Sequence, residues 1–157
     1  MDMNERLAPN FTMNEFFVAH DRGGTWRTRT WPQENTTIRP RPDNLLIQNL
    51  QVLRDMINRP ITISSGIRSV EHNATLSGSS ANSAHMTGAA ADFQVRQFTR
   101  NKQLFKAMPI NEMCDIVRAA IENGSIQVAF VYSGNTFIHI GTDFEVPRRS
   151  KWGVGFI

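Results

Sequence analysis

The feature that most constrains the fold of this chain is a set of polar residues placed among small and apolar neighbours. His85 and Asp92 lie in the segment 83–92 (SAHMTGAAAD), and His139 lies in 137–140 (FIHI), between two β-forming residues. A buried carboxylate or imidazole that finds no partner is strongly destabilising. A stable fold therefore has to give all three side chains partners, and one metal ion would serve the three together.

The chemistry of these three side chains suits zinc. Two neutral imidazoles and a carboxylate are common ligands of Zn²⁺, and three protein ligands leave a fourth position for water, as in catalytic sites. A packed, hydrogen-bonded histidine is the ordinary alternative, and it is how we interpret His20 and His72. From the residues alone, both interpretations stay open for His85, Asp92 and His139.

Length and charge limit the classes of protein to consider. A chain of 157 residues fits one domain, which we expect to span 1–157, and its single cysteine, Cys114, excludes an internal disulfide. The balance of 17 basic and 14 acidic residues is too mild for a dedicated nucleic-acid-binding protein. No apolar run reaches membrane-spanning length, and residues 1–6 lack the apolar core of a signal peptide. We therefore expect a protein made in the cytoplasm, with neither a nucleic acid nor a membrane as partner.

Hydrophobic periodicity predicts a mixture of helices and strands. Thr12 and Glu15 have capping-box spacing, with Phe11 and Phe16 placed to form a hydrophobic staple. The predicted helices are at about 13–19, from Asp43 to Pro60, and at 70–76, 101–107 and 111–122. The predicted strands are at about 61–65, 89–95, 126–132 and 136–140.

The segment 20–42 shows little periodicity and is predicted to be an irregular surface loop. It contains five arginines and two tryptophans. Arginine interleaved with tryptophan could contact an anionic partner. We favour the simpler interpretation of a solvated loop whose tryptophans lie against the domain.

Several segments resemble one family of enzymes. The segment 83–92, with its serine, histidine, glycine and aspartate, and the segment 137–140 resemble the zinc peptidases of the M15 group. This group includes D-Ala-D-Ala carboxypeptidases and the L-alanyl-D-glutamate endolysins of phages. The segment 65–69 (SGIRS) is similar to an element that lies upstream in that family, and 7–16 (LAPNFTMNEF) resembles the opening of its short, often phage-borne branch. The resemblance covers about residues 7–145.

The resemblance implies both a fold and a site. The fold is a small α+β domain, an antiparallel sheet flanked by helices, as in hedgehog and lysostaphin-like domains. His85, Asp92 and His139 would bind Zn²⁺. Arg68 would hold a substrate carboxylate or a developing oxyanion, and Ser83 would hydrogen-bond near the metal. A surface salt bridge for Arg68 and a turn hydroxyl for Ser83 are the alternatives.

The chain departs from the family at the general base. In the family a Glu or Asp commonly lies three residues before the second histidine, or a few more upstream in the same hairpin. Here those positions hold Thr136 and Ser133, which cannot serve as ordinary bases. Asp143 and Glu145 are the nearest acidic residues, and we take Asp143 as the candidate base.

Two functions follow as expectations. The first is a zinc-dependent peptidoglycan peptidase, phage-encoded, that cuts stem peptides next to D-Ala or at the L-Ala–D-Glu link. It would reach the cell wall after lysis or as part of a phage particle. The second is a catalytically weak or inactive metal-binding protein of the virion or the cell wall on the same fold, with other virion proteins as partners.

Overall fold

A computed structural model describes residues 2–20, 26–28, 41–67 and 84–143 of the chain. Its centre is a four-stranded antiparallel sheet in the order β5-β6-β10-β9. The strands of this sheet are β5 (Thr62–Ser65), β6 (Ala90–Gln94), β9 (Phe130–Ser133) and β10 (Ile138–Gly141). The predicted antiparallel sheet is thus confirmed, with strands shorter than the periodicity suggested.

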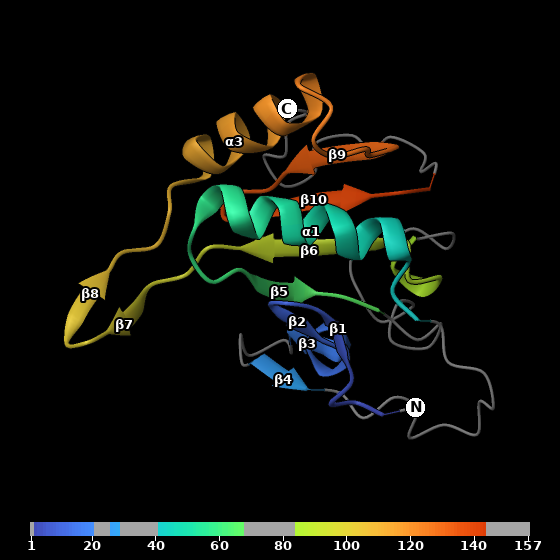
Figure 1. Ribbon diagram of the computed structural model, residues 1–157, viewed down its shortest axis with the longest axis horizontal. Coiled ribbons are helices and arrows are strands. Elements are labelled where there is room, and N and C mark those ends of the chain that lie inside the picture. Colours follow the sequence, from blue (N-terminus) through green and yellow to red (C-terminus); the bar gives the residue numbers. More distant parts are fainter. Residues whose placement is uncertain (1, 21–25, 29–40, 68–83, 144–157) are drawn as a thin grey trace.

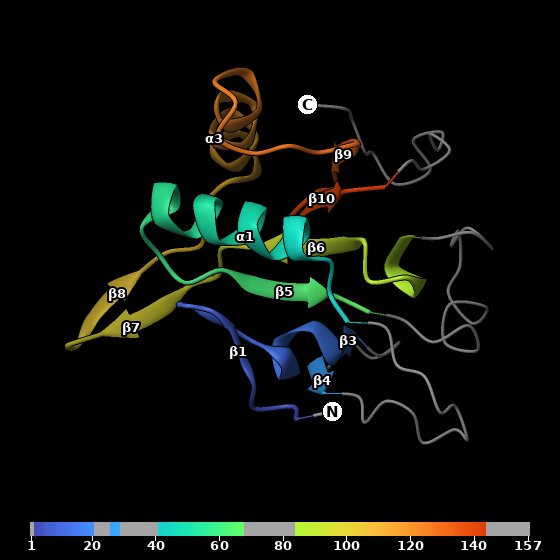
Figure 2. The ribbon, with the colours of Figure 1, turned by 45° about the vertical axis from the view of Figure 1, so that its right-hand side comes forward.

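Two helices cover one face of this sheet. They are α1 (Asn44–Ile57) and α3 (Ile110–Glu122), and Figures 1 and 2 show α1 lying over the sheet, roughly along the strands, with α3 beside it. Apolar side chains recur on α1 at three- and four-residue spacing and are buried, as are those of α3. The helices and the antiparallel sheet make this an α+β fold, as expected. Within the described residues, no helix has the length and apolar character that a bilayer crossing requires.

The sheet separates the hydrophobic core from a polar face. Side chains alternate across a strand, so Ala91 and Phe93 of β6, with Ile138 and Ile140 of β10, point into the core beneath the helices. The residues that alternate with these along each strand, Asp92 among them, point to the opposite face of the sheet. The face opposite the helices is therefore where polar chemistry gathers.

The N-terminal segment forms small paired elements beside β5. The elements are β1 (Arg6–Ala8), β2 (Phe11–Thr12), the 3-10 helix η1 (Met13–Phe17), β3 (Val18–His20) and β4 (Trp26–Thr28). One half of the capping box is present, because the Thr12 amide donates to Glu15 Oε2 at 2.6 Å. The staple is also present, with the rings of Phe11 and Phe16 6.2 Å apart.

Two predictions for this segment need correction. The helix predicted at 13–19 is a 3-10 helix that ends at Phe17 and gives way to β3. The segment 20–42 is not wholly irregular, since β4 pairs with β3 in an antiparallel ribbon. Local apolar spacing cannot foresee such a pairing, because it depends on a partner strand. The remainder of 20–42, apart from its described ends, lies outside the described residues.

The helix predicted at 101–107 is wrong. The structure has a hairpin there, with β7 (Phe98–Arg100) paired to β8 (Gln103–Phe105). Asn101 and Lys102 between them both have positive φ, 51° and 63°. That is the conformation of a two-residue type I′ turn, which matches the twist of antiparallel strands and excludes a helix.

The remaining helix predictions have mixed outcomes. Asp43 stands at the N-cap position of α1, but its side chain makes no capping hydrogen bond and instead accepts one from Thr142 Oγ1 at 2.8 Å. The helix predicted at 111–122 is α3, and Asn123 is its C-cap. The helix predicted at 70–76 lies outside the described residues.

Candidate metal centre

Strand pairing brings Asp92 and His139 together. In the register of β6 and β10, His139 is the direct partner of Asp92. Directly opposed residues of an antiparallel pair project to the same face. Since Ile138 and Ile140 face the core, His139 shares the opposite face with Asp92, and its Nδ1 lies 2.8 Å from Asp92 Oδ1.

His85 reaches the same point from the short 3-10 helix η2 (Ala84–Met86). Two backbone hydrogen bonds close this turn, with the amides of Thr87 and Ala89 both donating to the Ala84 carbonyl. Gly88 then leads the chain into β6 with a φ of 81°. A Cβ on Gly88 would also lie 2.1 Å from the Arg41 carbonyl oxygen, so this position requires glycine on both grounds.

The carbonyl group of Gly66 orients the His85 ring. His85 Nδ1 lies 2.8 Å from the Gly66 carbonyl oxygen, which can only accept, so Nδ1 carries the proton and Nε2 offers its lone pair. Gly66 itself sits against η1, and a Cβ there would be 2.1 Å from the Phe16 carbonyl oxygen. Gly66, directly after β5, thus serves the site through its backbone.

The donor atoms lie at distances that a metal ion can bridge. One ligating atom from each of His85, Asp92 and His139 lies within 4.8 Å of the others. Tetrahedral Zn²⁺ with bonds of about 2.0–2.1 Å separates neighbouring donors by about 3.3 Å. His85 Nε2 is 3.3 Å from Asp92 Oδ1, and His139 Nδ1 is closer, at 2.8 Å. The three residues therefore fit a site in which the protein supplies three ligands to one metal ion.

The site is buried and its carboxylate stays ionised. His85 and His139 are each 2% exposed and Asp92 is 8% exposed. Burial raises the pKa of Asp92, but the charges and hydrogen bonds of His85 and His139 outweigh it and hold this pKa well below its ordinary value. An ionised carboxylate supplies the anionic ligand of a metal site, and the imidazoles bind a metal in their neutral form.

Aromatic rings of β9 complete one side of the site. The ring of Tyr132 stacks on His139 with centroids 4.5 Å apart and planes at 17°, and Phe130 meets His139 edge-on at 5.9 Å. Tyr132 is also the register partner of His139. We did not predict a role for Tyr132 from the sequence. The available signal was that it is the chain's single tyrosine, on a strand predicted to form a hairpin with His139.

The structure describes only some of the other predicted site residues. Arg68 and Ser83 lie outside the described residues. Asp143 is exposed and lies two residues beyond the end of β10. Four residues of extended chain, the separation of Asp143 from His139, span about 13 Å. Thr136, at the usual base position, accepts a hydrogen bond from Gln94 Nε2 at 3.5 Å.

Comparison with known proteins gave one match. The family model described as Peptidase M15 matches residues 9–141, a span that contains all three converging side chains. Searches of curated proteins and of solved structures returned no match. The matched span agrees with the extent of the resemblance seen in the sequence.

Proposed function

The chain belongs to the Peptidase M15 family, and on this premise we propose that it is a zinc-dependent peptidoglycan peptidase. Peptidases of this family are metallopeptidases, which supports the proposal. The observation that carries the proposal is the convergence of His85, Asp92 and His139 within a chain that the family model matches over 9–141. The proposed reaction is hydrolysis of a stem-peptide amide bond, next to D-Ala or between L-Ala and D-Glu.

Zinc is the metal that the donor set favours. Two imidazole nitrogens and one carboxylate oxygen suit Zn²⁺ better than Mg²⁺ or Ca²⁺, which prefer oxygen ligands throughout. When bound, Zn²⁺ supplies a Lewis acid that polarises an amide carbonyl and makes water acidic enough to ionise near neutral pH. The three side chains leave further coordination positions for substrate.

The chain's own residues would hold and orient this centre. Asp92 and His139 are fixed by strand register, and the Gly66 carbonyl fixes the tautomer of His85. Asp143 is the proposed general base, which would take a proton from the attacking water and deliver it to the leaving amine. By resemblance to the family, Arg68 would bind a substrate carboxylate or oxyanion, and Ser83 would hydrogen-bond near the metal.

The proposed setting is a bacteriophage. The support is the likeness of segment 7–16 to the opening of the short, often phage-borne branch of the family. The protein would act on the host cell wall after lysis or as part of the particle. Its partners would be peptidoglycan stem peptides.

A second function is favoured by one specific observation. The hairpin of β9 and β10 has no carboxylate between 127 and 138, where the family commonly places its base. Loss of a general base typically lowers the rate about 10²–10⁴-fold. The alternative is therefore a protein of the virion or cell wall that keeps the metal and has lost catalysis.

One experiment separates the two functions. Purified protein is stripped with chelator, reloaded with Zn²⁺, and incubated with purified peptidoglycan, with the released fragments identified by mass spectrometry. A peptidase yields defined new amine and carboxyl termini, which also name the bond, and His85→Ala abolishes both these products and bound zinc. About one zinc per chain with no new termini would favour the second function. No zinc binding under metal-replete conditions would overturn both.

A further inference from the structure

One projecting segment of the chain carries basic residues and no acidic ones. We call residues 96–106 the basic arm; they comprise the β7–β8 hairpin and its two flanks. The arm contains four basic residues, Arg96, Arg100, Lys102 and Lys106, and no Asp or Glu. The chain as a whole has a net charge of +3, so everything outside the arm nets −1, that is +3 minus +4. The arm thus has a net charge of +4 with no acidic residue of its own to balance it.

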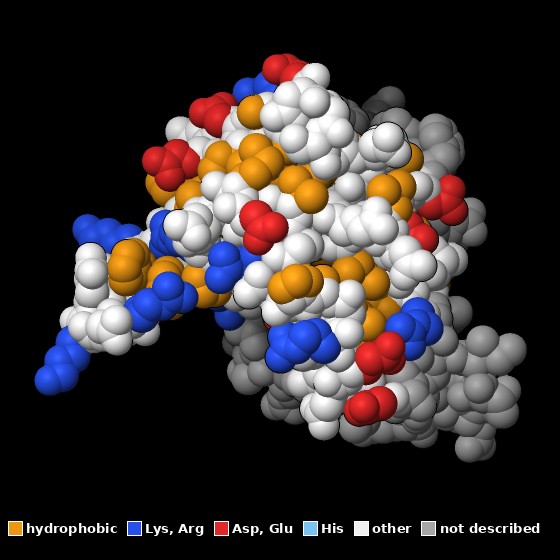
Figure 3. All heavy atoms as spheres, viewed as in Figure 1, with side chains coloured by type: hydrophobic (Ala, Val, Ile, Leu, Met, Phe, Trp, Pro, Cys, Tyr) orange, Lys and Arg blue, Asp and Glu red, His pale blue; other side chains and the backbone are white. Residues whose placement is uncertain are grey.

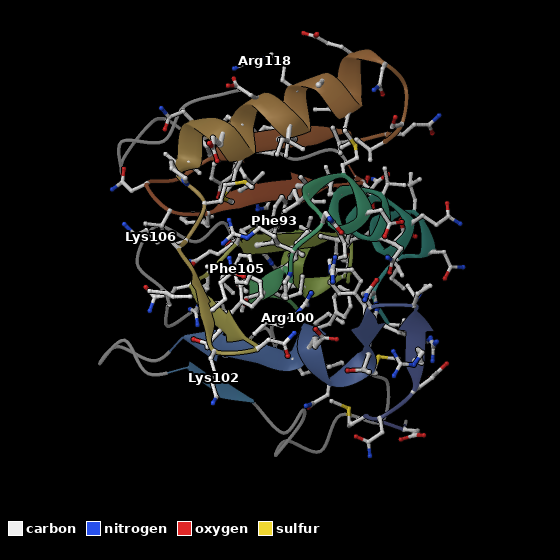
Figure 4. The ribbon with its side chains drawn as sticks, turned by 60° about the vertical axis from the view of Figure 1, so that its left-hand side comes forward. Phe93, Arg100, Lys102, Phe105, Lys106 and Arg118 are labelled. Atoms are coloured by element: carbon white, nitrogen blue, oxygen red, sulfur yellow. The ribbon has the colours of Figure 1, made fainter. Side chains whose placement is uncertain are left out.

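The basic arm stands clear of the domain. Figures 1 and 2 show β7 and β8 extending away from the sheet at the end of β6 opposite η2. Figure 3 shows Lys and Arg along this extension, and the Asp and Glu side chains lie over the body instead. Figure 4 shows Lys102 at the tip and Lys106 at the base of the hairpin. Residues 99–104 are all exposed, including Leu104 at 53%.

Aromatic packing gives the arm a defined shape. Phe98 and Phe105 face each other across the hairpin, stacked with centroids 4.7 Å apart and planes at 9°. The guanidinium groups of Arg59 and Arg100 lie 5.6 and 5.5 Å from the centre of the Phe98 ring. Arg59 also donates to the Lys106 carbonyl oxygen. These contacts order the hairpin and cover the face of Phe98, so this ring offers no platform for stacking a nucleobase.

The exposed charges along the arm are available to a partner. Arg100, Lys102 and Lys106 are exposed, and no carboxylate among the described residues forms an ion pair with them. Clustered like charges on a surface repel one another and raise the energy of the free protein. A polyanion removes that repulsion and releases its own counterions on binding.

We propose that the basic arm binds a phosphodiester polymer of the bacterial cell wall and so holds the metal centre close to its substrate. The identity of this polymer rests on the proposed function, because that function places the protein at the wall. Recognition by charge without base stacking does not suit a single-stranded nucleic acid, whose bases stack on aromatic side chains, and it does suit a simple phosphodiester chain. Phe98 lies six positions after Asp92, which is at most about 22 Å of extended chain, so a bound arm keeps the site within reach of the wall.

The test is binding to purified sacculi that either retain their phosphodiester polymers or have been stripped of them with hydrofluoric acid. Metal-depleted protein is used, so that hydrolysis does not change the sacculi. The triple variant Arg100→Gln, Lys102→Gln, Lys106→Gln is compared with a control of equal charge, Arg6→Gln, Arg54→Gln, Arg118→Gln. Thermal melts check folding, and the double variant Lys102→Gln, Lys106→Gln, which leaves the cation–π contacts in place, carries the test if the triple variant does not fold.

The expected result is specific to the arm. Wild type and the control variant bind equally well to sacculi that retain their phosphodiester polymers. The arm variant binds these sacculi at least about tenfold more weakly. Its slope of log affinity against log salt is smaller by about 2, at about 0.7 for each lost phosphate contact. On stripped sacculi, wild type binds no more tightly than the arm variant does. The arm variants cleave a small soluble muropeptide at the wild-type rate, so a failed peptidase and a failed arm give different results.

Three outcomes would overturn the proposal. Equal loss of binding in the control triple variant would mean that net charge, and not the arm, is responsible. Undiminished binding of wild type to stripped sacculi would mean that the partner is not the phosphodiester polymer. Tighter binding to duplex DNA than to the retained sacculi, at equal phosphate concentration and about 0.15 M salt, would point to a nucleic acid instead.

Discussion

Asp92 and His139 face each other across the β6–β10 pair, with Oδ1 of Asp92 2.8 Å from Nδ1 of His139. The two residues are 47 positions apart in the chain, yet strand register leaves their side chains little freedom. A metal ion binding here meets donors that are already in place, so little conformational entropy is lost on binding. The same contact explains why a carboxylate can remain buried and charged.

Removing the charge of Asp92 should remove most of the stabilisation that zinc binding gives the folded protein. Zinc at 100 times its Kd should raise the unfolding free energy of wild type by about 2.7 kcal/mol, because only the folded chain presents the assembled site. Asp92→Asn should lose most of this increase, which thermal melts with and without Zn²⁺ would measure. Asp115→Asn, at an exposed carboxylate on α3 paired with Arg118, is the control and should keep the full increase. An unchanged increase in Asp92→Asn would place the metal elsewhere.

Acid should release the metal through the histidines and not through Asp92. The imidazole charges and hydrogen bonds hold the pKa of Asp92 below its ordinary value despite burial, so this carboxylate stays ionised as the pH falls from 7 to 5. Protons compete with the metal for the imidazole lone pairs, so a protonated histidine cannot bind it. Zinc affinity measured by competition with a chromophoric chelator should therefore fall as the pH is lowered from 7 to 5. A fall confined to the region near pH 4 would instead indicate the carboxylate.

Gly66→Ala should weaken both the fold and the metal site. The new Cβ would lie 2.1 Å from the Phe16 carbonyl oxygen, and backbone must move to relieve that contact. We expect a loss of about 1–3 kcal/mol in stability. The shifted carbonyl should also cost about 10–100-fold in zinc affinity, because it no longer orients His85.

Gly124→Ala is the matched control for this change. Gly124 has a φ of 78° but open space around its Cβ position. Alanine there should cost about 1 kcal/mol in stability from backbone strain alone. Its zinc affinity should equal that of wild type, and an equal loss in both variants would show that general destabilisation, not His85 orientation, weakens the site.

Tyr132 should act on the site through its ring. The stack on His139 at 4.5 Å restrains the imidazole on the side away from Asp92. Aromatic pairs contribute about 0.5–1.5 kcal/mol, so Tyr132→Ala should weaken zinc binding by up to about tenfold. Tyr132→Phe keeps the ring and should bind zinc as wild type does. Calorimetric titration of the two variants compares them directly, and equal weakening in both would assign the effect to the hydroxyl group.

Asp143→Asn tests the proposed general base. If Asp143 takes the proton from water, the variant should hydrolyse peptidoglycan about 10²–10⁴-fold more slowly with unchanged zinc content. The exposed position of Asp143 makes a folding defect in this variant unexpected. A rate within twofold of wild type would exclude Asp143 as the base.

Local patterns were enough for much of the architecture. The apolar spacing of α1 and α3 and the alternation of β6 and β10 follow from the identity of neighbouring residues, and the structure confirms them. The helix predicted at 101–107 failed for a local reason too. Two consecutive residues with positive φ, Asn101 and Lys102, are favoured by the pairing of Phe98 with Phe105, which no helical pattern reveals.

The sequence by itself determined which side chains could form a metal site, because histidine and aspartate among alanine, glycine and isoleucine have no ordinary place in a core. Only the tertiary structure decided how they meet. Strand register sets His139 against Asp92 and Tyr132, and the backbone of Gly66 turns His85 toward them. Register and backbone carbonyl contacts join segments far apart in the chain, so their energies depend on the whole fold and leave no trace in local spacing.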